Sequence, residues 1–152
     1  LTEKQLKEAQ SAARTLGLEL HVLNARTEHD FDAVFAKLIQ LGAGGLAVNT
    51  NLVFTARAEQ LGALTVRKAI PAIYKGREFT AAGGLMSYGT DPTDSYRIAG
   101  VYTGRILKGE KPADLPVQQV SKVELIINLK TANALGITFP ITLLGRADEV
   151  IE

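Results

Sequence analysis

The chain of 152 residues contains no cysteine. Disulfide bonds, thiolate nucleophiles and cysteine-ligated zinc, iron-sulfur or copper sites are therefore excluded, while the redox compartment stays open. An excess of one charge is also lacking, because 17 Lys and Arg stand against 16 Asp and Glu. Without a strong overall field to hold nucleic acid or an anionic membrane surface, we expect no nucleic-acid partner.

Long hydrophobic runs are missing as well. The two most apolar stretches, residues 41–48 and 123–129, are far shorter than the ~20 residues that span a bilayer. The composition, 46% hydrophobic and 22% charged, is typical of a globular protein. We therefore expect a folded α/β or similar domain and no membrane span.

Motifs that carry catalysis or bind phosphate are absent too. The sequence has no GxGxxG after a strand, no GxxxxGK[ST], no GxSxG and no HExxH. The only two histidines, His21 and His29, do not have the spacing of metal ligands. The sequence thus predicts no catalytic residue, no metal site and no cofactor, and the protein is not expected to be an enzyme.

Hydrophobic periodicity predicts short strands that alternate with helices. Thr2 and Gln5 form a capping box for a first helix that ends before Gly17, and Gly109 is the expected C-cap of a longer helix. Helices are expected at about 2–16, 27–41, 53–64, 93–107 and 130–135, a turn or short helix at 78–82, and strands at 18–23, 45–48, 71–74, 85–88 and 123–128, with 137–152 left unassigned.

This alternation is typical of βαβ units, so we predict an α/β fold with a mostly parallel sheet and helices on both faces. On the long helix 93–107, the residues expected to be buried are Tyr96, Ala99, Val101, Tyr102 and Ile106. The proline-rich stretch 109–116 is the expected crossing between lobes. Because the chain opens on a helix, at Leu1 rather than Met, we expect it to be the later part of a longer α/β protein.

A ligand site in such a sheet is expected at the carboxyl ends of the strands. The loops that follow the predicted strands are 24–27, 49–51, 74–78 and 88–91, and each is rich in hydrogen-bonding groups. The candidate ligand-binding residues are Asn49, Thr50, Asn51, Tyr74, Arg77, Glu78, Tyr88 and Asp91.

Each candidate also has a purely structural interpretation. Asn, Asp, Gly and Thr after strands commonly cap helices, and Asp91 stands directly before Pro92 at a predicted helix start. A tyrosine at a strand end either stacks on a ligand or packs beside a loop. Arg77 and Glu78 either bind a carboxylate and an amine or form a surface pair.

Several stretches together resemble one known family. They are residues 69–74 (AIPAIY), 77–79 (REF), 82–89 (AGGLMSYG), 103–119 (TGRILKGEKPADLPVQQ), 127–132 (INLKTA) and 146–151 (RADEVI). These stretches are similar to the substrate-binding proteins of bacterial ABC importers, and the resemblance covers essentially the whole chain. Two departures, Gly76 before the Arg-Glu-Phe triplet and the loop 48–51, fall in the implied pocket, so ligand identity is not transferred.

The resemblance implies a type I periplasmic-binding-protein-like structure, in which two α/β lobes close on a ligand. This chain would be the C-terminal half of such a protein, and the N-terminal lobe would lie outside it. Residues 1–90 would form most of the C-terminal lobe, and residues 91–117 would belong to or contact the N-terminal lobe. Residues 118–152 would return to the C-terminal lobe.

The predicted function is therefore capture of a small polar ligand, such as an amino acid, for an ABC permease in the inner membrane. The protein would be periplasmic or otherwise extracytoplasmic. Two alternatives remain: a ligand-sensing domain of a transcriptional or signalling receptor with the same fold, and an α/β enzyme, which the missing motifs disfavour. A half-protein would also expose apolar surface, which predicts self-association of the isolated chain.

Overall fold

The computed structural model describes residues 2–49, 51–118 and 122–152. The chain divides into two compact units, Leu1–Ala43 and Gly44–Glu152, which are taken in turn. No described helix is both long enough and apolar enough to cross a membrane.

The first unit contains the helices α1 (Glu3–Thr15) and α2 (Phe31–Gln40), with a short 3-10 turn, η1 (Glu28–Asp30), before α2. The predicted capping box is confirmed: the Gln5 amide donates to Thr2 Oγ1 at 3.3 Å, and the Thr2 amide donates to Gln5 Oε1 at 3.0 Å. Gly17, at a φ of +67°, ends the helical segment in the left-handed region that glycine adopts without a Cβ clash. On α2, the buried residues are Phe31, Phe35 and Leu38, whereas Ile39 is 54% exposed.

The strand predicted at residues 18–23 is wrong. The structure gives these residues no regular secondary structure, and Leu18, Leu20 and Val22 all have exposed side chains. Alternating hydrophobicity signals a strand only when a neighbouring strand completes the ladder. Within its unit this segment has no such neighbour among the described residues.

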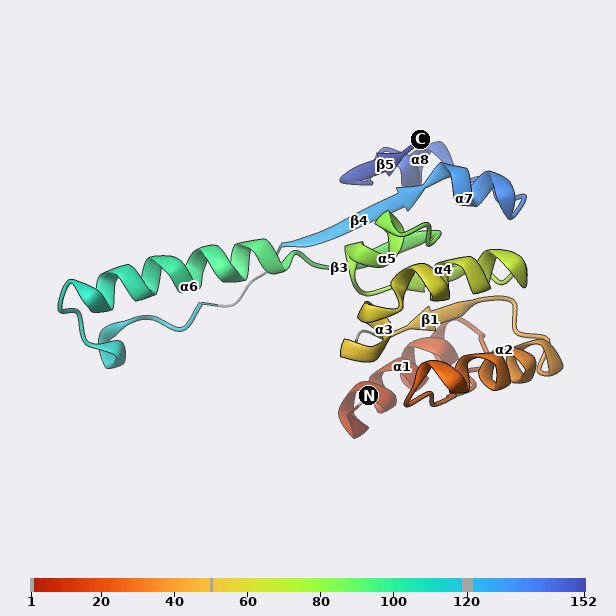
Figure 1. Cartoon of the computed structure of the whole chain (residues 1–152), viewed down its shortest axis with the longest axis horizontal. Helices are drawn as coiled ribbons and strands as arrows, with labels where there is room; N and C mark the ends of the chain where they lie inside the picture. Colours follow the sequence, from red (N-terminus) through yellow and green to blue (C-terminus); the bar gives the residue numbers. More distant parts are fainter. Residues whose placement is uncertain (1, 50, 119–121) are drawn as a thin grey trace. The chain divides into compact units, whose positions relative to one another are not determined.

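The second unit is built on a sheet of five strands in the order β1-β2-β3-β4-β5 (Figure 1). The pairs β1/β2, β2/β3 and β4/β5 are parallel, and β3/β4 is antiparallel, so the predicted mostly parallel α/β sheet is confirmed. The antiparallel pair brings the carboxyl ends of β1 to β3 and the amino ends of β4 and β5 to one side, here called the ligand edge. The strands are Leu46–Val48, Ala72–Tyr74, Met86–Thr90, Val123–Asn128 and Glu149–Ile151.

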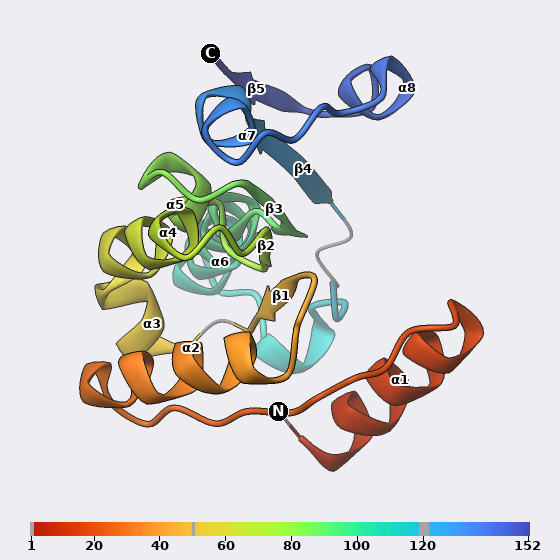
Figure 2. The same ribbon diagram turned by 90° about the vertical axis from the view of Figure 1, so that its right-hand side faces the viewer.

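Short helices connect these strands, and α4 and α5 lie beside the same part of the sheet (Figures 1 and 2). The single helix predicted at 53–64 is two helices, because Arg57 leaves the helical region at a φ of −119°. The described helices of this unit are α3 (Leu52–Ala56), α4 (Ala58–Arg67), α5 (Arg77–Ala81), α6 (Pro92–Leu107), α7 (Leu129–Ala134) and α8 (Ile141–Leu144), with a 3-10 turn η2 (Pro112–Asp114).

The core of the second unit lies between α4, α5 and the middle strands. Phe79 of α5 is fully buried and stacks on Tyr74 of β2, with ring centroids 4.9 Å apart. Tyr74 contacts Thr65 of α4 through their hydroxyl groups at 3.2 Å. Thr65 already donates its proton to the Gly62 carbonyl, so the Tyr74 hydroxyl is the donor of this second bond. This network joins α4 to the sheet beneath it.

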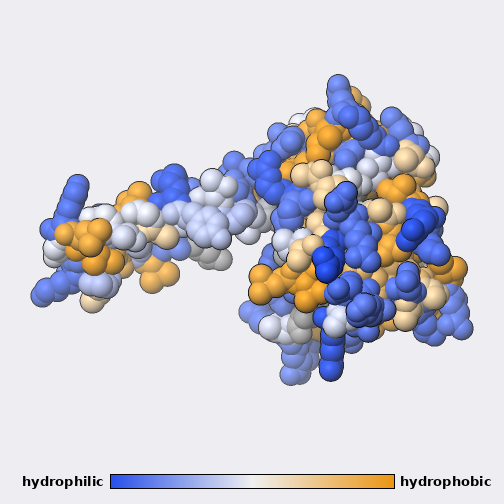
Figure 3. Space-filling model, viewed as in Figure 1, coloured by the Kyte–Doolittle hydropathy of each residue, from blue (hydrophilic) through white to orange (hydrophobic). Residues whose placement is uncertain are grey.

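Helix α6 leaves the sheet after β3 and extends away from it (Figure 1). The burial predicted on this helix is wrong for this chain, since α6 has no buried residue and Tyr96 is 77% exposed. Hydrophobic side chains are visible on the α6–η2 segment in Figure 3. Leu107, the last residue of α6, is 82% exposed. Amphipathic periodicity indicates which helix face is apolar. Among the described residues, the segment that returns after α6 contacts this helix, through a hydrogen bond from the Tyr102 hydroxyl to the Pro116 carbonyl, but it buries no residue of the helix. Gly109 takes a φ of +100°, as the predicted C-cap requires.

Two buried threonines give a test of this core. Thr80 Oγ1 is buried without a hydrogen-bond partner among the described residues, whereas Thr65 Oγ1 bonds both Gly62 and Tyr74. Thr65→Val should lower the free energy of unfolding by about 1–3 kcal/mol, because it leaves the Tyr74 hydroxyl unsatisfied. Thr80→Val, the matched control, removes an unsatisfied hydroxyl and should be neutral or stabilising. Urea denaturation measures both, and equal losses would contradict this description of the core.

Candidate functional site

The ligand edge is organised around residues 75–78, here called the loop 75–78, which comprise the two-residue connection after β2 and the first two residues of α5. The Lys75 carbonyl oxygen lies against Gly89 of β3, where a Cβ atom would sit only 1.9 Å from it. Gly89 pairs with Glu124 across the antiparallel β3/β4 ladder. Only glycine permits this approach, so the loop lies directly on one rung of the ladder.

Arg77 extends from this loop to the two strands that begin at the ligand edge. Its guanidinium contacts Glu124 of β4 at 3.4 Å and Glu149 of β5 at 2.8 Å. Glu124 is 11% exposed, and its other carboxylate oxygen accepts from Lys122 at 2.8 Å. Arg77 therefore forms ion pairs with Glu124 and Glu149 rather than with Glu78.

Glu78 points in a different direction. Its carboxylate accepts from Thr55 Oγ1 of α3 at 3.3 Å and lies over Gly76, where a Cβ would come within 2.2 Å of Oε1. No Lys, Arg or His of the described chain forms an ion pair with this half-buried carboxylate. A negative charge without a cationic partner therefore lies beside the loop at the ligand edge.

The loop after β1 combines capping with candidate contacts. Asn51 caps α3 by accepting from the Phe54 amide at 2.8 Å, which matches the structural interpretation, and its side chain is exposed. Asn49 is partly exposed directly after β1. Thr50, the third candidate in this loop, lies outside the described residues.

The two candidate tyrosines are placed very differently. Tyr74 is 1% exposed, and burial raises the pKa of its hydroxyl, so its ring belongs to the core rather than to an open surface. Tyr88 of β3 is 59% exposed, with an accessible ring. Of the two, Tyr88 alone offers an aromatic face for stacking in this conformation.

Asp91 acts as the N-cap of α6. Its carboxylate accepts from the Thr93 amide at 2.8 Å, and this bond holds the pKa of Asp91 below its usual value. Arg77 and Lys122 lower that pKa further through their charges. In turn, Glu124 raises the pKa of Lys122. Asp91 is thus close enough to Arg77 of the loop 75–78 for the arginine charge to affect its pKa.

The remaining loop, residues 24–27, is explained by turn chemistry. Asp30 accepts from the Arg26 and Thr27 amides at 2.8 and 2.9 Å, and these bonds lower the pKa of Asp30. The strand predicted before this loop does not form, so the loop does not lie at the carboxyl end of a strand. The rule that places ligand sites at such ends therefore does not apply to it.

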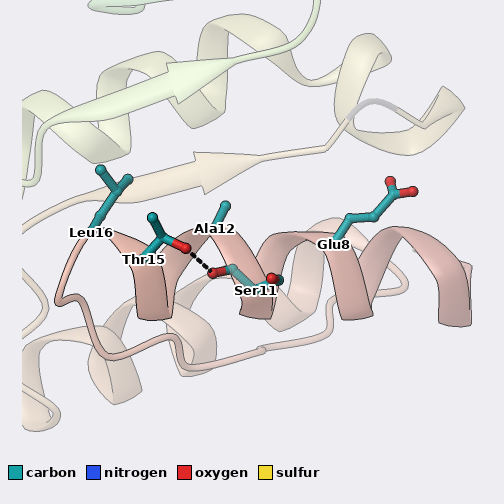
Figure 4. Close-up of a pocket in the computed structure, with 5 residues that line it drawn as sticks. All are labelled: Glu8, Ser11, Ala12, Thr15 and Leu16. Carbon is teal, nitrogen blue, oxygen red and sulfur yellow. Dashed lines mark hydrogen bonds between the residues drawn. The ribbon is translucent and has the colours of Figure 1, made fainter.

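Two hollows lie on helix surfaces. One lies along α1 and is lined by residues of a single segment, Glu8, Ser11, Ala12, Thr15 and Leu16 (Figure 4). Thr15 Oγ1 donates back to the Ser11 carbonyl at 3.0 Å, so that hydroxyl is already used within the helix. The other lies beside α6, between Tyr102 and residues 117–118. The first is the open face of a single helix, whereas the second is lined by α6 and by Val117 and Gln118 of the return segment.

Sequence reasoning missed four residues at the ligand edge: Thr55, Lys122, Glu124 and Glu149. Glu124 and Glu149 were detectable as isolated acids at the start of apolar strands. Their position follows from the antiparallel direction of β4. A rule for parallel sheets would instead place residues at the start of a strand at the opposite side of the sheet. Among the described residues, no group of three His, Asp or Glu side chains is arranged to hold a metal ion.

Together, the mostly parallel sheet and the charged and polar groups along one edge define an α/β lobe. The chain is similar over 98% of its length to an "ABC domain in complex with L-Trp" from Streptococcus pneumoniae, at 25% identity and a TM-score of 0.82. A conserved domain protein of Vibrio cholerae O1 biovar El Tor shares 21% identity over 97% of this chain, with a TM-score of 0.83.

A ligand-free, open substrate-binding protein with adhesive properties from Clostridium difficile is also similar, at 19% identity over 98% of this chain and a TM-score of 0.69. No curated protein matches the chain significantly. A model of the ABC transporter substrate-binding protein family matches residues 2–151, and the chain belongs to that family. The chain spans about half of each solved relative, 49% to 51%.

Family membership confirms the resemblance seen in the sequence. Proteins of this family and fold are in general not enzymes, and they are typically extracytoplasmic. A solute-binding role follows for the family as a whole.

The Asp91 cap predicts a pH dependence. A carboxyl whose pKa is lower in the folded state stabilises that state above its unfolded pKa, and the contribution is lost as pH falls through the folded value. Asp91→Ala should therefore lower the Tm at pH 7, and the difference from wild type should shrink below about pH 3.8. Asp114→Ala, at an exposed position at the end of η2, is the matched control. A Tm difference for Asp91→Ala that is constant from pH 7 to pH 2.5 would argue against the cap.

Proposed function

We propose that the protein containing this chain is an extracytoplasmic solute-binding protein that delivers a small polar molecule, such as an amino acid, to an ABC permease in the inner membrane. Membership of the substrate-binding family supports transport over sensing by a receptor. No catalytic role is proposed for any residue. The ligand would lie on the ligand edge of the sheet, enclosed from the other side by a second lobe.

The observation that carries this proposal is the Glu78 carboxylate. It is half-buried, it is hydrogen-bonded to Thr55, and it lies at the carboxyl end of β2 without a cationic partner among the described residues. A carboxylate held in place by a neighbouring hydroxyl is a suitable acceptor for a ligand ammonium group. Arg77, in contrast, is held by two glutamates, so a ligand carboxylate placed there would meet both of their negative charges.

The other contacts would come from the neighbouring loops. The loop after β1 contains Asn49, Thr50 and Asn51. The exposed ring of Tyr88 lies on β3, and Asp91 directly precedes α6. Side-chain amides, a carboxylate and an accessible aromatic face suit a molecule with both polar and apolar parts. The L-Trp bound to the pneumococcal relative has this character. No specific ligand is inferred from that relative, since Gly76 and the loop 48–51 depart from the family pattern.

The second lobe would be supplied by the part of the protein outside this chain. The solved relatives are about twice as long, and residues 91–117 include large apolar side chains that are exposed, such as Tyr96 and Leu107. This segment would therefore pack on the N-terminal lobe. Residues 1–90 and 118–152 would form the C-terminal lobe, and ligand contacts with both lobes would shift the equilibrium towards the closed form.

The Glu78 contact is tested by ligand binding to the full-length protein. Isothermal titration calorimetry against the 20 amino acids and their des-amino analogues identifies the ligand and asks whether its ammonium is needed. Glu78→Gln should then weaken the best amino acid by about 10- to 100-fold, as expected when a charge-assisted hydrogen bond worth about 1.5–3 kcal/mol is lost.

Glu59→Gln, on the exposed surface of α4, is the matched control and should leave affinity unchanged. Equal binding of the amino acid and its des-amino analogue would contradict the ammonium contact. Absence of binding across a broad library of small molecules, with turnover of any one of them, would contradict the solute-binding function itself.

The uncovered α6 face gives a separate test. The isolated 152-residue chain should self-associate, because Tyr96, Val101 and Leu107 are 50% to 82% exposed. Sedimentation velocity of the chain carrying Val101→Ser and Leu107→Ser should show less association, and full-length protein should be monomeric. A chain that is fully monomeric at 100 μM would contradict the proposal that this face needs a partner.

A further inference from the structure

We propose that Arg77 is a positioning residue that fastens the ligand-binding loop 75–78 to β4, the strand through which the chain re-enters the sheet, and to its neighbour β5. This inference rests on the proposed function, because it concerns how the same site is coupled to closure. It assigns Arg77 a role other than ligand contact.

The first step is the contact between the loop and β3. The Lys75 carbonyl lies where a side chain at position 89 would be, so the loop and Gly89 are in direct backbone contact and cannot approach each other further. Gly89 is the second-last residue of β3, and α6 begins at Pro92. Any movement of the chain where it leaves the sheet therefore reaches this contact within a few residues.

The second step is the contact with β4. Arg77 binds Glu124, the residue paired with Gly89 across the ladder, and it also binds Glu149 of β5. Glu124 is the second residue of β4, where the chain re-enters the sheet. The loop thus contacts both members of one rung, with a backbone contact on β3 and an ion pair on β4.

The third step is electrostatic. Glu124 receives a cation on each carboxylate oxygen, from Arg77 and from Lys122, and it is only 11% exposed. Removal of Arg77 would leave Glu124 with one partner and Glu149 with none among the described residues. Partly buried ion pairs of this kind are costly to break from one side, which favours a fixed loop position over a mobile one.

Two neighbouring residues would therefore have different roles. Glu78 faces the ligand, and Arg77 holds the loop that presents Glu78. When the lobes close, the rung Gly89–Glu124 and the loop would move as one body, so ligand bound at Glu78 would favour the closed arrangement of the strands. An unfastened loop would bind the ligand more weakly, because the loop must be ordered during binding.

The test uses full-length protein and two independent measurements. Hydrogen exchange in the absence of ligand reports the fastening itself: in Arg77→Ala, the amides of residues 75–79 should exchange about tenfold faster, while α4 is unchanged. Calorimetry with the ligand should show roughly tenfold weaker binding for Arg77→Ala. Arg77→Lys should recover part of both effects, and Arg67→Ala, an exposed arginine on α4, is the matched control.

Glu124→Gln separates positioning from ligand contact. If Arg77 positions the loop, Glu124→Gln should weaken ligand binding like Arg77→Ala, and the double variant should be no worse than the single ones. If Arg77 instead binds the ligand, Glu124→Gln should leave affinity unchanged or improve it, and the proposal is overturned. Gly89→Ala, which displaces Lys75, should reproduce the faster exchange in the loop.

The outcomes also separate this inference from the proposed function. If residues 75–79 exchange faster in Arg77→Ala but the protein binds no small molecule, the positioning role of Arg77 is supported and the solute-binding role is refuted. If exchange is unchanged and the protein does bind its ligand, the positioning role is refuted and the solute-binding role is supported.

Discussion

The antiparallel pairing of β3 with β4 is the constraint on which the arrangement of this molecule depends. In a fully parallel sheet the carboxyl ends of all strands lie together, and residues at the start of a strand lie at the far side. Here the chain leaves after Thr90, forms α6, and returns in the opposite direction at Val123. That reversal brings Glu124 and Glu149 to the side where β1 to β3 end, and it gives the loop 75–78 its charged partners.

The resulting ligand edge contains two kinds of charged group. Arg77, Lys122, Glu124 and Glu149 neutralise one another across β4, β5 and the loop after β2. Glu78 lies on the other side of the same loop, over Gly76 and against Thr55, without a cation of its own. Neighbouring residues in the sequence thus take separate roles, one in holding the loop and the other in presenting a charge. The close contact at Gly89 is what allows the loop to lie on the sheet at all.

Much of this fold follows from hydrophobic periodicity, because helix and strand patterns decide local structure wherever a partner is present. The buried face of α2 and the strand 123–128 are such cases. Residues 18–23 and the apolar face of α6 show the limit, since both patterns need a neighbour that the unit does not supply. At the site, the carboxyl-end rule selected the loops 49–51, 74–78 and 88–91, but it could not decide which side chains point into the core. Tyr74 stacks on Phe79, and the partners of Arg77 lie 47 and 72 residues away along the chain.

The central claim is that the ligand contacts Glu78, while Arg77 stays bound to Glu124 and Glu149. A crystal structure of the full-length protein with its ligand tests this most directly. The account predicts a ligand nitrogen within about 3 Å of the Glu78 carboxylate, with the Arg77 ion pairs intact. A ligand carboxylate bound to Arg77, with Glu124 and Glu149 released, would contradict it.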